Sequence, residues 1–289
     1  MLSSLLSILA SAAVYAVLAT AAVLVYRTNH VLSFHVGELG MLGAYAAVAV
    51  LPLAPAGAVG VAIGVLASMV VAAGVSVVMH VVVDRWGGAR GPFVGTVLTI
   101  AAAIILLGFT SFMWSGEAKR FRLMQGVLEI GGARVAWNTI FVIVLCTVCV
   151  WLAQAVVGHS RLGISMRAVA NSRRLAELRG IPVPRVLLVV WLISGLLTGI
   201  AGLTFASLSS VSMEGSFIGV SAIVAAILGG MTSLPGAIIG AVLLAGAEHL
   251  VTLHLDARYS QVVPTVILVA VLAIRPSGLS GRVETIARV

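Results

Sequence analysis

Long apolar runs, separated by short polar breaks, constrain this chain more than any other feature of its sequence. A helix needs about 20 apolar residues to cross the hydrocarbon core of a bilayer. Nine runs approach or reach that length, and two of them, 36–51 and 217–228, are short. The other seven are residues 5–26, 58–83, 93–113, 139–157, 186–208, 237–253 and 262–274. The pattern predicts an all-α fold, a polytopic membrane helix bundle of eight to nine spans.

Composition excludes a soluble domain and argues against nucleic acid as a partner. Of the 289 residues, 61% are hydrophobic and only 9% are charged, and the mean hydropathy is +1.19. The net charge of +8 comes from arginines in loops between apolar runs, where membrane orientation explains them better than nucleic-acid binding. Cys146 and Cys149 lie inside an apolar run and are interpreted as packing residues, with no metal or cofactor expected. We expect one transmembrane domain over residues 1–289, in a bacterial-type inner membrane.

The longest charged interruption, residues 158–185, carries six arginines, one glutamate and no lysine. Residues 164–170 and 172–179 have the pattern of two short helices in tandem. Asn171 stands where the second helix needs an N-cap, and Gly180 is placed for a left-handed C-terminal turn. These signals predict a structured platform with an apolar stripe and an arginine-rich rim, suited to docking a partner. The alternative is a loop that only fixes membrane orientation by the positive-inside rule.

Orientation follows from placing this loop and the tail from residue 275 onward in the cytoplasm. Counting spans backwards then puts residues 84–92 inside and the N-terminus outside. The segment 115–138 also lies outside, although it carries Lys119, Arg120, Arg122 and Arg134. Strand-like residues 127–130 and 133–135 flank a Gly-Gly pair in this segment and predict a β-hairpin.

The two halves of the chain, residues 5–113 and 186–275, resemble each other. In each half a long run precedes a short glycine-bearing one, followed by a Pro/Gly turn and two more runs. Residues 37–64 match residues 219–240, and the span count makes the halves inverted around the linker 139–157. Short, interrupted segments at matching places in inverted halves indicate a transport path. The alternatives are chance similarity of Ala/Val/Gly-rich helices and small residues that serve only close packing.

Three motifs carry a resemblance to a known family. The family's cytoplasmic loop is similar to the stretch GISMRAVANSRRLAELRGIPVPRV. Its L-G-G-x-x-S-x-P-G-A stretch is similar to ILGGMTSLPGAIIGAVLLAGAEHL. Its N-F-A-[HQ]-G-x-x-x-M-L-G-A-Y stretch is similar to LSFHVGELGMLGAY. Over nearly its whole length the chain resembles permeases of the branched-chain amino-acid ABC importer family, closest to the shorter permease subunit. Ser33 and the pair His35-Val36 depart from the third motif, which leaves urea or short amides as alternative substrates.

The resemblance implies partners and site residues. It implies ATP-binding-cassette subunits on the cytoplasmic side, a second, related permease subunit, an extracytoplasmic solute-binding protein and contact with membrane lipid. The ATPase-coupling residues would be Gly163, Arg167, Ala168, Asn171, Arg173, Arg174, Leu175, Ala176, Leu178 and Gly180. The translocation path would include Phe34, His35, Gly37, Glu38, Gly229, Gly230, Pro235 and Gly236. The misplaced charges Lys119, Arg120 and Arg122 would dock the binding protein, unless they are only solvated or contact lipid headgroups.

The residues themselves bear on two alternatives. Lys119 is the single lysine, and its context SGEAKRF is not a phosphate-binding loop, so we expect no ATPase activity and no enzyme. A stand-alone proton- or ion-coupled carrier would need a carboxylate or histidine well inside the bilayer. Glu38, Glu214 and Glu248 lie near predicted span ends, so this alternative has weaker support. An intramembrane enzyme would need a catalytic constellation that the sequence does not offer.

Overall fold

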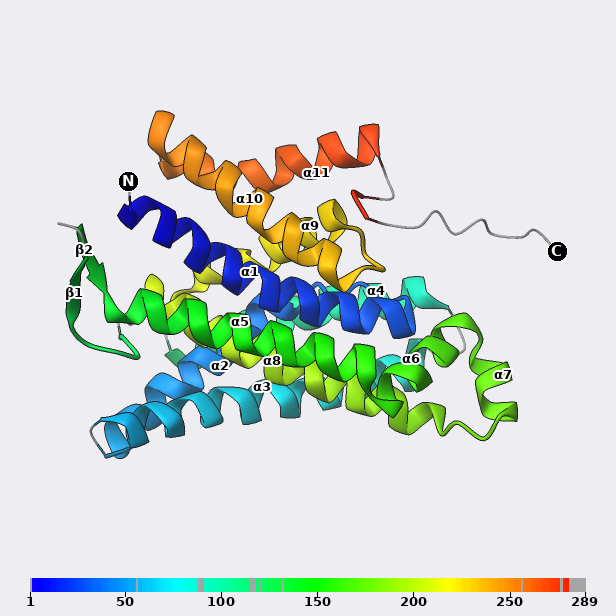
Figure 1. Ribbon diagram of the computed structural model, residues 1–289. Helices are drawn as coiled ribbons and strands as arrows, with labels where there is room; N and C mark the ends of the chain where they lie inside the picture. The colour runs from blue at the N-terminus through cyan, green and yellow to red at the C-terminus, as the bar shows by residue number, and fades with distance from the viewer. Residues whose placement is uncertain are drawn as a thin grey trace.

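The computed structural model describes residues 2–55, 57–87, 91–114, 118–119, 121–130, 133–255, 257–275 and 278–280. Within them the chain forms a helix bundle with one small hairpin (Figure 1). The helices are α1 (Leu2–Asn29), α2 (Val36–Val50), α3 (Ala58–Gly87), α4 (Pro92–Trp114), α5 (Trp137–His159), α6 (Arg161–Asn171), α7 (Arg173–Leu178), α8 (Val183–Leu208), α9 (Ile218–Gly229), α10 (Leu234–His254) and α11 (Val263–Ile274). Short 3-10 turns are η1 (Leu51–Leu53), η2 (Met213–Phe217) and η3 (Ala257–Gln261), and the strands are β1 (Val127–Ile130) and β2 (Ala133–Ala136).

The nine apolar runs all form helices. Seven helices are long and apolar enough to cross a membrane, and two shorter apolar helices cover 215–229 and 259–274. The prediction of an all-α, polytopic membrane bundle is confirmed. Several boundaries differ from the predicted runs by a few residues. Helix α1 continues past residue 26 to Asn29, and α3 continues past residue 83 to Gly87. The hydroxyl of Thr28 donates to the carbonyl of Leu24 at 2.9 Å, so the helix itself satisfies the hydrogen bond of this polar side chain.

Helix α1 runs through the middle of the bundle (Figure 1). It packs against α5 and α8 on one side and against α9 and α10 on the other. Its side chains Val14, Leu18 and Leu24 are almost fully buried. The hydroxyl of Ser194 on α8 donates to the carbonyl of Ala21 at 3.0 Å, which joins the two helices. The core therefore lies along α1.

Small residues bring α2, α3 and α8 into backbone contact. A Cβ atom added to Gly202 of α8 would lie 2.1 Å from the carbonyl oxygen of Gly40 of α2. A Cβ atom added to Gly199 would lie 2.7 Å from the carbonyl oxygen of Ser68 of α3, and the Ser68 hydroxyl donates to the Gly199 carbonyl at 2.8 Å. Membrane helices associate through such close packing and interhelical hydrogen bonds, because the lipid removes the hydrophobic driving force between them.

The N-terminal ends of α2 and α9 meet inside the bundle. A Cβ atom on Gly37 would lie 2.0 Å from the carbonyl oxygen of Ser216 and 2.8 Å from the backbone nitrogen of Gly219. From this contact α2 runs toward the end of the bundle that carries the hairpin, whereas α9 runs toward the opposite end (Figure 1). Gly37 and Gly219 head the two matched segments of the sequence. The contact supports the predicted inverted halves, which otherwise stay a prediction.

The hairpin lies at one end of the molecule and α6 and α7 at the other (Figure 1). Strands β1 and β2 pair antiparallel, as predicted, with Val127 opposite Ala136 and Ile130 opposite Ala133. The Gly-Gly turn falls outside the described residues. The N-terminal end of α1 shares the end of the hairpin, and the C-terminal end of α11 shares the end of α6 and α7. This arrangement agrees with the predicted orientation. We call the two ends extracytoplasmic and cytoplasmic in that sense.

Candidate functional site

Helix α6 rests on the cytoplasmic end of the bundle through an apolar face. Gly163, Met166 and Val169 are buried, and this spacing places them on one side of the helix. The turn into α6 is tight, since a Cβ atom on Gly163 would lie 1.8 Å from the carbonyl oxygen of Val157. The Arg167 guanidinium donates to the same carbonyl at 3.1 Å. Gly163 and Arg167 therefore fix the angle between α5 and α6.

The cap of α7 differs from the prediction. Asn171 is the last residue of α6, and the N-cap is Ser172, whose hydroxyl accepts from the backbone nitrogen of Leu175 at 3.3 Å. Ser172 has extended dihedral angles (φ −164°, ψ 115°) that separate the two helices, and serine caps as well as asparagine. The predicted stop is present: Gly180 has φ +76°, and the backbone nitrogen of Ile181 donates to the Ala176 carbonyl at 3.0 Å.

The outward side of α6 and α7 carries an apolar pair within a polar rim. Leu175 and Leu178 are 64% and 76% exposed, although both belong to a charged segment outside every membrane span. Arg167, Asn171 and Arg174 are the exposed polar residues among those predicted for coupling on the same two helices. We call these five residues the coupling surface. Of the other predicted coupling residues, Gly163 and Ala176 are buried and Ala168 is half-buried, so they support the surface from behind.

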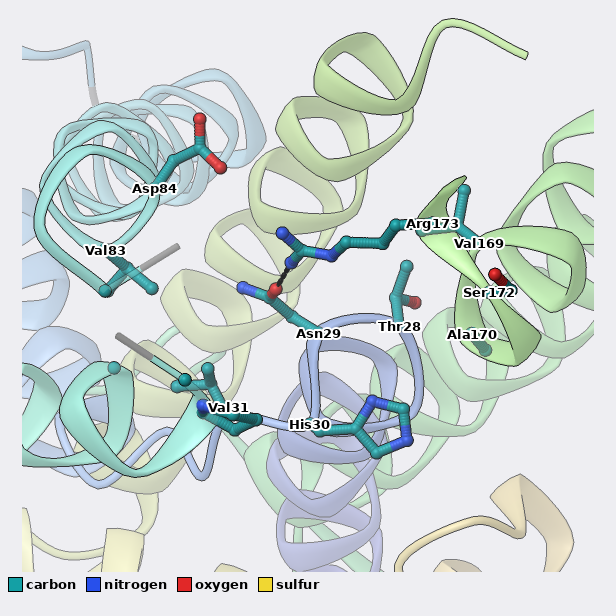
Figure 2. Close-up of a pocket in the computed structure, with 14 residues that line it drawn as sticks. Thr28, Asn29, His30, Val31, Val83, Asp84, Val169, Ala170, Ser172 and Arg173 are labelled. Carbon is teal, nitrogen blue, oxygen red and sulfur yellow. Dashed lines mark hydrogen bonds between the residues drawn. The ribbon is translucent and has the colours of Figure 1, made fainter. Parts of the chain in front are cut away.

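Arg173 points into the bundle and not away from it. Its guanidinium donates to the side-chain oxygen of Asn29 at the end of α1 (Figure 2). Both residues line a cavity of about 280 Å³ between α1, α3, α4 and α6, in which Asp84 and Val83 of α3 also lie. Arg173 thus connects the start of α7 to the end of α1. A direct contact of Arg173 with an ATPase stays a prediction.

A second cavity, of about 500 Å³, joins two of the sequence motifs. It is lined by Arg167 and Asn171 from α6 and by Pro235 from the turn that starts α10. Arg27 from the last turn of α1 and His30, which follows α1, lie on its wall as well. The cytoplasmic loop motif and the L-G-G-x-x-S-x-P-G-A motif, 64 positions apart between Asn171 and Pro235, therefore meet at the cytoplasmic end of α1.

The predicted path residues separate into two groups. In the first group, His35 is 2% exposed and stacks on Trp191 of α8, with ring centroids 5.9 Å apart and an interplanar angle of 22°. His80 of α3 lies on the same tryptophan at 6.3 Å. Trp191 was not predicted from the sequence, because no local pattern shows that His35 and His80 lie against it.

The second group forms the tight connection between α9 and α10. A Cβ atom on Gly229 would lie 1.9 Å from the carbonyl oxygen of Gly236, and Gly230 has φ +103°. Pro235 is exposed at the cytoplasmic end. The residues of this group pack against each other, while Gly37 of the first group packs against Gly219. A place for Gly229, Gly230, Pro235 and Gly236 in the path stays a prediction.

The three acidic side chains considered in the sequence differ in surroundings. Glu38 is half-buried in α2, and its Oε2 atom has no hydrogen-bond partner among the described residues. Glu248 of α10 accepts hydrogen bonds from Tyr15 and Ser221, a set that the sequence could not reveal. The side chain of Glu214 lies outside the described residues.

The basic residues proposed for docking lie beside the hairpin. Lys119 is half-buried, Arg122 is exposed, and Arg120 falls outside the described residues. The backbone of Lys119 exchanges hydrogen bonds with Val211, at 3.0 and 2.9 Å, which fixes this segment near the end of α8. Their docking role stays a prediction.

Comparison with known proteins now identifies the family. Residues 4–272 match the family described as the permease component of branched-chain amino acid transport systems. The chain is 28% identical over 283 residues to the high-affinity branched-chain amino acid transport system permease protein LivH of Escherichia coli (strain K12), covering 93% of this chain and 92% of that protein. It is 27% identical over 285 residues, with the same coverage, to the permease protein BraD of Pseudomonas aeruginosa.

A more distant relative is LsrC of Shigella flexneri, the autoinducer 2 import system permease protein. It is 28% identical over 178 residues, covering 58% of this chain and 50% of that protein. The names of these relatives give no support to urea or short amides, and they do not favour a stand-alone carrier. The resemblance seen in the three motifs is confirmed. With a match that covers nearly its whole length, the chain belongs to the family of permease components of branched-chain amino acid transport systems.

Proposed function

We propose that this chain is the membrane-spanning permease subunit of an ATP-driven importer that carries branched-chain or related amino acids. The observation that carries the proposal is the coupling surface. Leu175 and Leu178 are exposed at the cytoplasmic end, outside the membrane spans and among arginines. An apolar centre with a polar rim is the usual anatomy of a protein–protein contact. The partner proposed for this contact is the ATP-binding-cassette subunit.

The other partners follow from the same assignment. Relatives named as parts of branched-chain amino acid transport systems support a second, related permease subunit and an extracytoplasmic binding protein. The permease would contribute the path, while hydrolysis on the separate subunits would drive its helices through α6 and α7. The ties of Arg173 to α1 and of Arg167 to α5 give such a movement a mechanical route into the bundle.

Uptake measurements separate this proposal from a stand-alone carrier. The chain is reconstituted in proteoliposomes with its ATP-binding-cassette subunits and second permease, and leucine-loaded binding protein is added outside. We expect leucine uptake to require enclosed ATP and to persist after an uncoupler collapses the proton gradient. Uptake by the chain alone that stops with the uncoupler would favour the secondary carrier instead.

Reversing the charges beside the hairpin is expected to slow docking of the binding protein. The variant replaces Lys119, Arg120 and Arg122 with glutamate. Charges at the rim of an interface act mainly on the association rate, and the Debye length is roughly 8 Å at physiological ionic strength. The association rate should fall by about tenfold or more at low salt and less at high salt. Surface plasmon resonance on reconstituted nanodiscs measures it.

The matched control replaces the same three residues with glutamine, which removes the charges without reversing them. Its association rate should lie between those of the wild type and the glutamate variant. Basal ATPase activity without binding protein should stay unchanged in both variants. Equal association rates for all three proteins at every salt concentration would show that the hairpin region is not the docking site.

A further inference from the structure

A third cavity, of about 480 Å³, is lined by residues of α1, α8, η2, α9, α10, η3 and the start of α11. The C-terminal end of α10 lies at the extracytoplasmic end of the bundle (Figure 1). Its volume is within the range of small-molecule sites. One part of its wall is apolar and includes Phe205, Ile218 and Pro264. Another part is polar and includes Ser221, Glu248, Gln261 and Thr265. The cavity therefore suits a small solute with an apolar body and a polar head.

Glu248 is the acidic group of this cavity, and residues of two other helices hold it. It lies on α10, inside a segment long and apolar enough to span the membrane. The Tyr15 hydroxyl of α1 donates to its Oε2 atom at 2.6 Å. The Ser221 hydroxyl of α9 donates to its Oε1 atom at 3.3 Å. Three helices thus orient one carboxylate, and each of its oxygens keeps a further lone pair for another donor.

No cation neutralises this carboxylate among the side chains that the structure describes. The ion pair found within 4 Å in that part of the chain joins Arg134 to Glu129 in the hairpin, far from Glu248 in sequence. Acidic side chains inside membrane spans are rare, and they are normally paired or mark a substrate or ion pathway. Two hydroxyl groups stabilise the charge of Glu248 but do not cancel it. The site is therefore suited to a cationic donor from outside the described chain.

We propose that Glu248, Tyr15 and Ser221 bind the ammonium group of an α-amino acid on its way through the permease. An ammonium group brings one positive charge and three donors, which match a carboxylate with free lone pairs. The apolar wall would contact the aliphatic side chain of the amino acid, and Gln261 and Thr265 would face the polar end of the amino acid. The amino-acid class of the ligand rests on the proposed function; the ammonium preference rests on the cavity.

The surroundings distinguish this ligand from a bare metal ion. A calcium ion takes six to eight oxygen ligands and a magnesium ion close to six. The structure offers one carboxylate here, and within its described residues no group of three or more His, Cys, Asp or Glu side chains gathers anywhere. A 480 Å³ cavity with an apolar wall also exceeds the needs of a single ion.

The test measures charge preference inside the cavity directly. Thr265, which lines the cavity, is replaced with cysteine in a chain whose Cys146 and Cys149 are replaced with alanine. Right-side-out membrane vesicles with the assembled transporter are treated with aminoethyl or sulfonatoethyl methanethiosulfonate. We expect the ammonium reagent to react faster than the sulfonate, and Glu248→Gln to lower the ratio of the two rates by about tenfold or more, in the range of electrostatic focusing in clefts. Glu248→Asp, which keeps the charge, should retain most of the ratio.

Ligand protection supplies a second, independent readout. Leucine should slow labelling of the cysteine in the chain with Glu248, whereas 4-methyl-2-oxopentanoate, which has the same skeleton without the ammonium group, should not. Equal rate ratios with and without the Glu248→Gln substitution, or equal protection by both ligands, would overturn the inference. ATP-driven leucine uptake by the wild type is measured in the same vesicles. Normal uptake without a charge preference contradicts this inference alone, and a preference without ATP-driven uptake contradicts the proposed function alone.

Discussion

Replacing Gly37 with alanine is expected to abolish uptake and to lower the yield of folded protein sharply. The new Cβ atom would lie 2.0 Å from the carbonyl oxygen of Ser216 and 2.8 Å from the backbone nitrogen of Gly219. Both obstacles are backbone atoms, so no side-chain rotation relieves the clash and α2 must move away from α9. Overpacking of this kind destabilises a protein by about 1–3 kcal/mol, occasionally more.

The matched control is Gly74→Ala in α3. Nothing lies within 4 Å of a Cβ atom at Gly74, so the substitution adds the same methyl group without a contact. In a helix it should be neutral or stabilise by about 0.4–1 kcal/mol, because alanine restricts the unfolded chain. Melting temperature in detergent and uptake in proteoliposomes are measured for both variants. Gly219→Ala, 2.6 Å from the Gly37 nitrogen, should behave like Gly37→Ala. Wild-type stability and uptake in Gly37→Ala would show that the two helices separate easily.

The spans and the hairpin could be predicted from the sequence because each is a local property. Bilayer thickness sets the length of an apolar run, and the nine runs became nine helical segments. Strand-like residues on either side of a Gly-Gly pair predicted the hairpin, and its strands formed at the predicted places. Gly180 ended α7 as predicted, because a left-handed turn favours glycine.

The arrangement of side chains between helices could not be predicted in the same way. Tyr15 and Glu248 are 233 positions apart, and His35 meets Trp191 across two helices. Helices that are apolar on all sides give no periodic signal to show which face meets which neighbour. Two adjacent capping residues, Asn171 and Ser172, also left the local signal ambiguous, and the second of them forms the cap.

The position of Arg173 changes the design of a test for ATPase docking. Sequence reasoning grouped Arg173 with Arg174 as a contact for the ATPase, but its guanidinium binds Asn29 inside the bundle (Figure 2). A variant that alters Arg173 would therefore disturb the tie between α7 and α1 as well as the surface. Leu175 and Leu178 are exposed and offer a cleaner test of docking.

Replacing both Leu175 and Leu178 with aspartate is expected to abolish co-purification of the ATP-binding-cassette subunits. Apolar residues at the centre of an interface can each contribute about 2 kcal/mol or more, a weakening of roughly thirtyfold per residue. Burying two new carboxylates in the contact adds a desolvation penalty. Because both side chains point outward, the permease itself should stay folded and in the membrane. Pull-down from detergent extracts measures the association, and size-exclusion chromatography monitors the fold.

Two further variants separate docking from coupling. Leu53→Asp places a carboxylate at a leucine that is 85% exposed in the connection between α2 and α3, remote from the coupling surface, and should leave the pull-down unchanged. Arg173→Ala breaks the tie to Asn29 without altering the exposed leucines, so the ATPase should still co-purify while leucine uptake per ATP hydrolysed falls. Asn29→Ala should reproduce that loss, because it removes the other partner of the same hydrogen bond. A pull-down that survives Leu175→Asp with Leu178→Asp would place the docking contact elsewhere on the cytoplasmic end. A pull-down lost with Arg173→Ala but kept with Asn29→Ala would instead assign Arg173 to the ATPase contact.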